Sequence, residues 1–182
     1  MTTLGDLFTE RVGRELDLRG IVVAVSRIPY GRPSELTPEA VLNEWRGTCS
    51  TKHLLLRELS AERWPHRGLE LWNRVYRVDR DLALKRWGRS VADLVPAAGL
   101  VDVHMFATLR DPHVVVDATF PVDDWDGTSD MTLWCGPGTD SEAGEDPLAS
   151  KAQLVEMHCD PSVREPFIEA LSRAEIGTGL RR

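Results

Sequence analysis

Two runs of β-prone residues, LVDVHMFATL (100–109) and HVVVDATF (113–120), constrain the fold of this chain more than any other feature of its sequence. The polar, proline-containing stretch RDPH (110–113), whose histidine also opens the second run, joins them. Two such runs joined by a short turn predict an antiparallel β-hairpin. Because apolar residues recur at helical spacing in much of the remaining chain, the sequence predicts an α+β fold with the hairpin in an antiparallel sheet.

The hairpin carries two ionisable residues, His104 and Asp117, in otherwise apolar strands. Side chains alternate between the two faces of a strand. A connecting loop with an even number of residues therefore places both on one face, opposite or diagonal to each other and about 5 to 8 Å apart at Cβ. An odd loop would separate them. Burying such a pair costs desolvation free energy, which favours a functional role over a turn-capping Asp117 and a structural His104.

Helices are expected before the hairpin. Residues 5–16 space their apolar side chains at helical intervals, and Thr37 followed by Pro38 is typical of a helix start, with the helix ending near Gly47. The apolar, β-branched run 20–29 ends in proline and predicts a short buried strand.

The rest of the chain mixes both patterns. Residues 68–79 predict a strand, residues 82–95 a helix interrupted by glycine, and residues 123–147 a long loop or flap rich in Asp, Gly, Ser and Pro. Two short helices are expected to close the chain, one after Pro147 and one after Pro161.

The segment WRGTCSTKH (45–53) places Cys49 where a loop becomes a leucine-rich helix. The first amides of a helix lack intrahelical acceptors and carry the positive end of the helix dipole, which favours thiolate over thiol. Gly47 lets the chain turn sharply, and Thr48 or Ser50 is suited to cap the helix. The position suits a nucleophile, and an unreactive buried cysteine is the alternative.

A nucleophilic thiol needs a base within hydrogen-bond reach and a third group that orients the base. Cys49, His104 and Asp117 are candidates for these three roles, in that order. The sequence therefore predicts a thiol nucleophile with a histidine base and an orienting carboxylate.

These residues give the chain a resemblance to the transglutaminase-like branch of the papain-type thiol enzymes, over about residues 37–121. In that family a cysteine opens a helix, a histidine lies on a following strand, and an aspartate lies on the next strand within VDAT or VDPT, as in VVVDATF here. The resemblance implies a fold in which the Cys49 helix packs on an antiparallel sheet, and a thioester acyl-enzyme formed without a cofactor. WRGTC adds a weaker resemblance to arylamine N-acetyltransferases, whose cysteine follows an Arg-Gly pair.

The chain departs from the family pattern at three places. Met105 and Phe106 follow the histidine, where the family often has a small residue and Trp. Ser-Thr-Lys-His follows the cysteine, where Gly-aromatic-Ala is usual. The long separation of Cys49 from His104 implies an inserted helix around residues 80–95. These departures leave open whether the substrate is a peptide, a protein or a small amide or thioester, and whether water or an amine resolves the acyl-enzyme.

Five further residues are candidates for substrate binding: Trp45, Arg46, Thr48, His53 and Trp134. A tryptophan beside the thiol suits an acyl or side-chain pocket, and core packing is the alternative. Arg46 suits a substrate carboxylate unless it pairs with a surface acid. His53 lies one helical turn after Cys49, where it is either a substitute base or a hydrogen-bonding partner behind the site.

Lys52 is expected on the solvated face of the same helix, and the alternative is that it lowers the thiol pKa. Cys135 and the adjacent pair His158 and Cys159 carry ligand-type atoms, but no CxxC or HxxxH spacing predicts a metal site. Three cysteines at wide spacing also do not indicate a disulfide framework.

Length and charge limit the remaining function classes. At 182 residues the chain suits a single domain, residues 1–182, and a formal net charge of -7 argues against a general nucleic-acid binder. The charged opening residues are typical of neither a secretory leader nor a membrane span, so we expect a cytoplasmic protein. The sequence favours a cysteine hydrolase or acyltransferase. The alternative is a non-catalytic domain that keeps this fold to bind a peptide or protein.

Overall fold

The computed structural model describes residues 2–174, and this part of the chain has an α+β architecture with a four-stranded antiparallel sheet. The strands are β1 (Glu70–Val78), β2 (Leu100–Arg110), β3 (His113–Val116) and β4 (Gly138–Glu142), in the order β3-β2-β1-β4. The helices are α1 (Leu4–Val12), α2 (Leu18–Ser26), α3 (Pro38–Glu44), α4 (Cys49–Arg63), α5 (Arg80–Trp87), α6 (Arg89–Ala92), α7 (Pro147–His158) and α8 (Pro161–Arg173), with a 3-10 turn at Pro65–Arg67. The predicted α+β class is confirmed.

Strands β1 and β2 form the centre of the sheet and pair along their whole length, from Glu70 opposite Thr108 to Val78 opposite Leu100. Strand β3 is much shorter and pairs only with the part of β2 from residue 107 onward. The edge of β2 from 100 to 106 therefore has no strand partner in the described part of the chain. His104 lies on this open stretch of edge.

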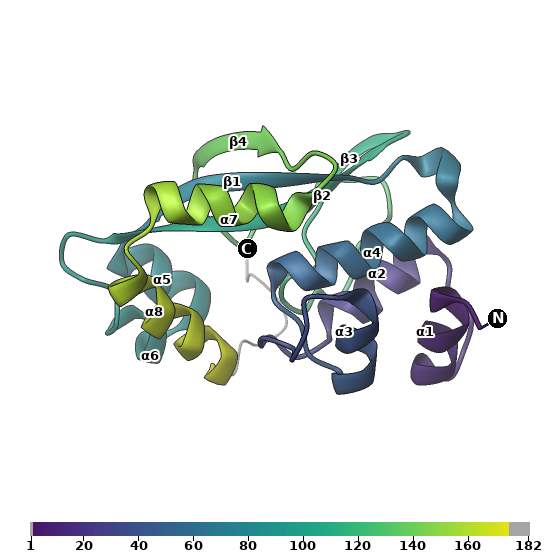
Figure 1. Ribbon diagram of the computed structural model, residues 1–182, viewed down its shortest axis with the longest axis horizontal. Coiled ribbons are helices and arrows are strands. Elements are labelled where there is room, and N and C mark those ends of the chain that lie inside the picture. The colour runs from purple at the N-terminus through teal and green to yellow at the C-terminus, as the bar shows by residue number, and fades with distance from the viewer. Residues whose placement is uncertain (1, 175–182) are drawn as a thin grey trace.

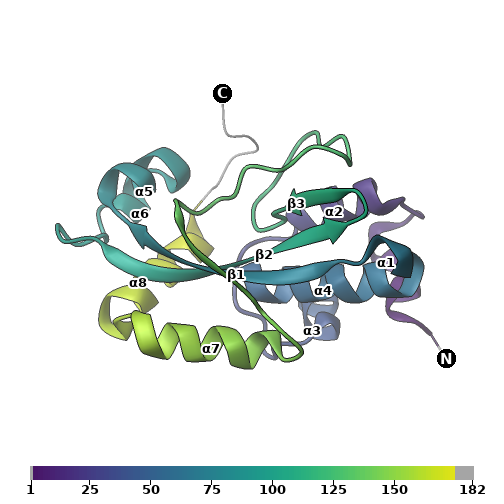
Figure 2. The ribbon, with the colours of Figure 1, turned by 90° about the horizontal axis from the view of Figure 1, so that it is seen from above.

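Helices cover both faces of the sheet. Figure 2 shows α4 and α7 on one face and α5 and α6 on the other. Both α4 and α7 contact β2, and in Figure 1 the beginning of α7 lies next to the beginning of α4. This arrangement brings the starts of two helices to the open edge of β2.

Two buried apolar clusters hold these layers together. The first contains Phe8 of α1, Val22 of α2, Leu55 of α4 and Met105 of β2, all at most 1% exposed. The second joins α5, α6 and α8 to the far ends of β1 and β2. The larger share of the packing against α4 comes from the first cluster, which fixes the helix that bears Cys49.

Most predicted elements are confirmed, but the strand predicted at 20–29 is wrong, since α2 occupies most of this run. The Asp17 side chain caps α2 by accepting a hydrogen bond from the Gly20 amide, 2.8 Å away. A short apolar run does not distinguish a strand from a buried helix by periodicity. Packing against α4 decides the outcome in favour of the helix, despite the β-branched side chains.

Strand β4 lies within residues 123–147, where the sequence predicts only a loop. All five of its residues are exposed, and its composition, GTDSE, has no apolar alternation. It is an edge strand held to β1 by backbone pairing, with Arg74 of β1 bound to Asp140 by two hydrogen bonds. Such a strand leaves no hydrophobic pattern in the sequence.

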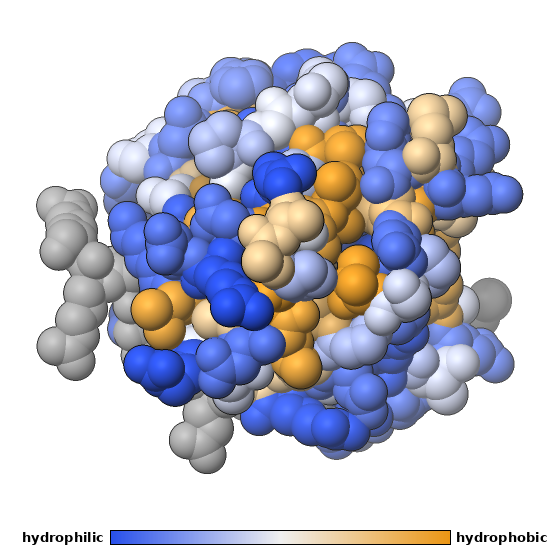
Figure 3. All heavy atoms as spheres, turned by 90° about the vertical axis from the view of Figure 1, so that its left-hand side faces the viewer, coloured by the Kyte–Doolittle hydropathy of each residue, from blue (hydrophilic) through white to orange (hydrophobic). Residues whose placement is uncertain are grey.

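Apolar side chains reach the surface at the end of the molecule that carries α5, α6 and α8, where Figure 3 shows them interspersed with charged ones. Leu84 and Leu94 are about half exposed there. Scattered exposed leucines are ordinary on a protein surface. Within residues 2–174, no helix combines the length and the apolar character needed to cross a membrane.

Leu55 tests the importance of the packing beneath α4. Leu55→Ala is expected to lower the free energy of unfolding by about 2 to 5 kcal/mol, because Leu55 is fully buried and its removal leaves a cavity. Leu84→Ala, at a half-exposed position of α5, is the matched control and is expected to cost less than about 1 kcal/mol. Urea denaturation measures both. Equal losses would contradict the assigned core.

Candidate active site

Cys49 is the first residue of α4, as the sequence predicts. Thr48 precedes the helix, and its amide donates to Oγ1 of Thr51 at 2.9 Å. Gly47 allows the close approach of the preceding loop, since a Cβ there would lie 2.8 Å from Cγ of Lys52. The thiol is 6% exposed, so it sits at the positive end of the helix with little water around it.

His104 and Asp117 lie on the same face of the hairpin, because the loop is even. Arg110 pairs with His113, so the turn contains two residues, and Val116 pairs with Ala107. Continued by one residue, this register places Asp117 diagonal to His104. Nε2 of His104 lies 2.8 Å from Oδ2 of Asp117. The structure brings both side chains to the edge of β2 beside Cys49.

The Asp117 carboxylate is fully buried and bound by backbone donors as well as by the imidazole. The Thr119 amide donates to Oδ1 at 3.1 Å, and the Trp134 amide donates to Oδ2 at 2.9 Å. Burial raises the pKa of Asp117, but His104 and these hydrogen bonds hold it below its usual range. Asp117 is therefore an anion.

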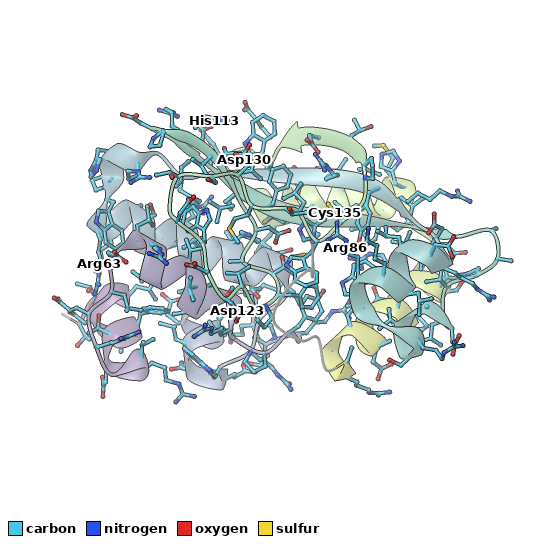
Figure 4. The ribbon with its side chains drawn as sticks, turned by 180° about the vertical axis from the view of Figure 1, so that it is seen from behind. Arg63, Arg86, His113, Asp123, Asp130 and Cys135 are labelled. Atoms are coloured by element: carbon cyan, nitrogen blue, oxygen red, sulfur yellow. The ribbon has the colours of Figure 1, made fainter. Side chains whose placement is uncertain are left out.

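The segment that contributes the Trp134 amide returns along β3. The Val115 amide donates to Oδ1 of Asp130 at 2.7 Å, and the Met131 amide donates to the carbonyl of Val115 at 2.9 Å. Figure 4 shows Asp130 near His113, at the start of β3. These contacts fix the path of the segment over the sheet and so place Trp134 against Asp117.

Lys151 completes the cluster and was not identified from the sequence. It comes from α7, and its Nζ donates to the Cys49 sulfur at 3.0 Å and to Oγ of Ser50 at 2.9 Å. The side chain is buried, and it lies 102 residues from Cys49. The only signal in the sequence is scarcity: the chain has three lysines, Lys52, Lys85 and Lys151, among 22 basic residues.

The electrostatic environment favours an ionised thiol. Burial raises the pKa of Cys49, but the Lys151 ammonium and a hydrogen bond from His104 lower it to about 5. Burial opposes charge on His104, yet Asp117 and the thiol raise its pKa well above the ordinary value. At neutral pH the site therefore holds a thiolate, an imidazolium and a carboxylate.

His53 lies behind the thiol and does not reach a substrate. It is fully buried, its Nδ1 lies 2.7 Å from the Cys49 carbonyl, and its Nε2 accepts from the Ala118 amide at 3.0 Å. Burial lowers the pKa of His53 to about 4, so the ring is neutral with its proton on Nδ1. The prediction that His53 binds substrate is therefore wrong, and the structure favours the hydrogen-bonding role behind the site.

The prediction that Lys52 lies on a solvated face is wrong, because it is fully buried. Its Nζ donates to the carbonyls of Ser26, at 3.1 Å, and Thr119, at 2.7 Å. Burial lowers the pKa of Lys52 to about 7, although Asp117 and Cys49 raise it. On the Lys52 side, the first turn of α4 is enclosed between α2 and the segment after β3, so this side chain has no contact with solvent.

A pocket of about 200 Å³ opens beside the thiol, and of the candidates for substrate binding only Thr48 lines it. Its walls are largely apolar and include Leu148, Val155 and Ile168. A second hollow of about 450 Å³, which contains Arg46, shares part of its lining with this pocket. Arg46 therefore lies near the thiol pocket but outside it.

The two tryptophans predicted near a substrate have other surroundings. Trp45 packs beside α1, with the Arg11 guanidinium 5.3 Å from its ring centre. Trp134 is buried, its ring meets Phe120 edge-on at 4.9 Å, and its contact with the site is through its backbone amide. Core packing, the alternative reading of tryptophans in the sequence, accounts for both side chains.

All three cysteines are free, and residues 2–174 contain no group of three His, Cys, Asp or Glu side chains arranged to hold a metal ion. Comparisons with family models, curated proteins and solved structures gave no match to this chain. The chemistry of the site therefore has to be argued from its own geometry.

The thiol pKa values predict which cysteine reacts first. The pKa of Cys49 is about 5, so this thiol is ionised at pH 6.5 to 7. At this pH iodoacetamide is expected to alkylate Cys49 before Cys135 and Cys159, because burial raises the pKa of the other two thiols. Cys135 is also enclosed close to Arg86 and β1 (Figure 4). Mass spectrometry of tryptic peptides measures the order of labelling.

The sign of the pH dependence follows from the same pKa. The rate of Cys49 alkylation should rise as the pH increases through about 5 and stay level above it. A Cys49 that reacts only above about pH 8, as an ordinary thiol does, would contradict the ion pairing described here.

Proposed function

We propose that this chain is a cytoplasmic cysteine enzyme of the transglutaminase-like, papain-type class, which cleaves an amide, peptide or thioester bond through a thioester acyl-enzyme. The observation that carries the proposal is the placement of Cys49 at a helix start, with His104 and Lys151 against its sulfur and Asp117 bound to His104. A structural cysteine has no need of two cationic partners in a buried site.

The resemblance in sequence and the arrangement in space support the same class. The cysteine helix packs on an antiparallel sheet, the histidine lies on one strand of a hairpin, and the aspartate directly follows the other strand. The predicted inserted helix between cysteine and histidine corresponds to α5 and α6. These features match the order and spacing expected of the family.

The first half of the reaction is attack by the Cys49 thiolate on a substrate carbonyl. Nε2 of His104 is engaged by Asp117, so Nδ1 is the nitrogen that faces the sulfur. The imidazolium gives its Nδ1 proton to the leaving nitrogen or sulfur as the tetrahedral intermediate collapses. Asp117 keeps the ring in this orientation and stabilises its positive charge.

In the second half, neutral His104 takes a proton from the incoming nucleophile, which attacks the thioester and releases Cys49. Water gives hydrolysis and an amine gives acyl transfer. The acyl chain has an apolar pocket available beside the thiol, lined by Leu148, Val155 and Ile168. Substrates are therefore expected to carry an apolar or small acyl group, as a peptide, a protein side chain, a small amide or a thioester.

The proposal predicts a pre-steady-state burst with p-nitrophenyl acetate. Wild-type protein should release about one equivalent of p-nitrophenolate per chain and carry an acetyl group on Cys49, detected by mass spectrometry. Cys49→Ala should abolish the burst, and Asp117→Asn should slow it by about 10²- to 10⁴-fold because the imidazole loses its orienting anion.

Cys159→Ala is the matched control and should retain the full burst, since this residue lies outside the site. Equal bursts from wild type and Cys49→Ala would remove the proposed nucleophile. An inert wild type whose Cys49 still alkylates at pH 6 would instead favour the non-catalytic peptide- or protein-binding domain.

A further inference from the structure

Lys151 has a position that thiol activation alone does not explain. Its Nζ contacts both the reacting sulfur and Ser50, and its side chain forms part of the wall of the pocket beside the thiol. An ammonium has three donors, and two are used in the described part of the chain. The third is available to a group that enters the pocket.

We infer that the Lys151 ammonium is an oxyanion donor, which transfers its hydrogen bond from the Cys49 sulfur to the substrate carbonyl oxygen when the tetrahedral intermediate forms. The inference rests on the proposed acyl-enzyme chemistry and adds a catalytic residue to it. The first oxyanion donor is the Cys49 backbone amide, which donates to no acceptor within residues 2–174. Lys151 is the second.

The movement of charge during the reaction supports this role. Before attack the negative charge is on sulfur. After attack the sulfur is a neutral thioether and the charge is on the carbonyl oxygen, bonded to the same carbon and about 3 Å from the sulfur. An ammonium 3.0 Å from the sulfur reaches that oxygen by a side-chain rotation, without a shift of α7.

Among the residues that the structure describes, no other cation near the thiol is available for the oxyanion. His104 has to deliver its proton to the leaving group, and Lys52 donates to two backbone carbonyls on the far side of the first turn of α4. The two arginines of the pocket are also paired, since Arg164 is bound to Asp102 at 2.7 Å and Arg32 to Glu165 at 2.6 Å. The hydrogen bond to Ser50 holds the Lys151 ammonium in position, so the ammonium is already in place before the substrate binds.

Atoms and charges balance without any proton leaving Lys151. The sulfur forms a bond to the carbonyl carbon, and the π electrons of the carbonyl move to oxygen. On collapse they re-form the carbonyl, the bond to the leaving group breaks, and His104 supplies the proton that the leaving group needs. Lys151 remains an ammonium throughout, so it is a donor and not an acyl acceptor.

Two reactions of the same sulfur separate this role from thiol activation. Alkylation by iodoacetamide needs only the thiolate, whereas acylation by p-nitrophenyl acetate also forms an oxyanion. Both rates are to be measured from about pH 5 to 10 in wild type, Lys151→Met and Lys151→Gln. Lys85→Met, at an exposed position of α5, is the matched lysine control. Circular dichroism confirms that each variant folds.

Lys151→Met should raise the thiol pKa, so both reactions slow at neutral pH. Above the new pKa, alkylation should return to the wild-type rate, but acylation should stay about 10²- to 10³-fold slower because a donor to the oxyanion is missing. Lys151→Gln keeps a neutral N–H donor, and should recover part of this loss while its thiol pKa stays raised. Lys85→Met should match wild type in both reactions.

Three results would overturn the inference. Parallel recovery of acylation and alkylation at high pH in Lys151→Met would limit Lys151 to lowering the thiol pKa. An acetyl group recovered on Lys151 would identify it as a nucleophile. Absence of acylation in wild type would overturn the enzyme proposal together with the inference, and this outcome is distinct because the first two require an active wild type.

Discussion

The buried carboxylate of Asp117 is the interaction on which the site depends. It has no exposed surface, and it accepts hydrogen bonds from β2 through His104 and from the segment after β3 through Thr119 and Trp134. His53 of α4 lies 3.8 Å away. An anion in such surroundings is tolerated only when its donors remain in place, because an unpaired buried charge costs several kcal/mol. Asp117 therefore holds the sheet, the segment after β3 and the cysteine helix in one arrangement.

A second buried anion, the Cys49 thiolate, gives the site its balance of charge. The anions Cys49 and Asp117 and the cations His104 and Lys151 lie together in a buried volume, next to Lys52, whose pKa burial lowers to about 7. Ion pairs in such a region are strong, but desolvation makes each unpartnered member costly. His53 avoids this cost by remaining neutral and using both ring nitrogens for backbone hydrogen bonds. The neutral ring is what allows a histidine so close to the imidazolium of His104.

The parts of this site that follow local rules were predictable. The parity of the hairpin loop determines that His104 and Asp117 share a face, and the helix start at Cys49 is visible in the spacing of its leucines. Lys151 and the burial of Lys52 were not predictable, because they depend on how distant helices pack and not on neighbouring residues. The same holds for α2, whose β-branched sequence favours a strand until α4 packs against it. The rarity of lysine in an arginine-rich chain is the one clue that composition offers.

The pairing of Cys49 with Lys151 links reactivity to stability. An unfolded thiol has a pKa of about 8.5, and the folded value is about 5, so the unfolded chain binds the proton more tightly. The stabilisation that the thiolate contributes is complete above about pH 8.5 and is lost as the pH falls through 5.

In the proposed reaction, attack of the sulfur on a substrate carbonyl, like protonation, removes the charge from the sulfur and leaves the buried Lys151 ammonium without its anion. The nearest group able to replace that anion is the oxygen of the acyl group itself. In the proposed reaction, a charge arrangement that stabilises the resting protein would therefore become, once the sulfur is neutral, one that stabilises negative charge on the substrate.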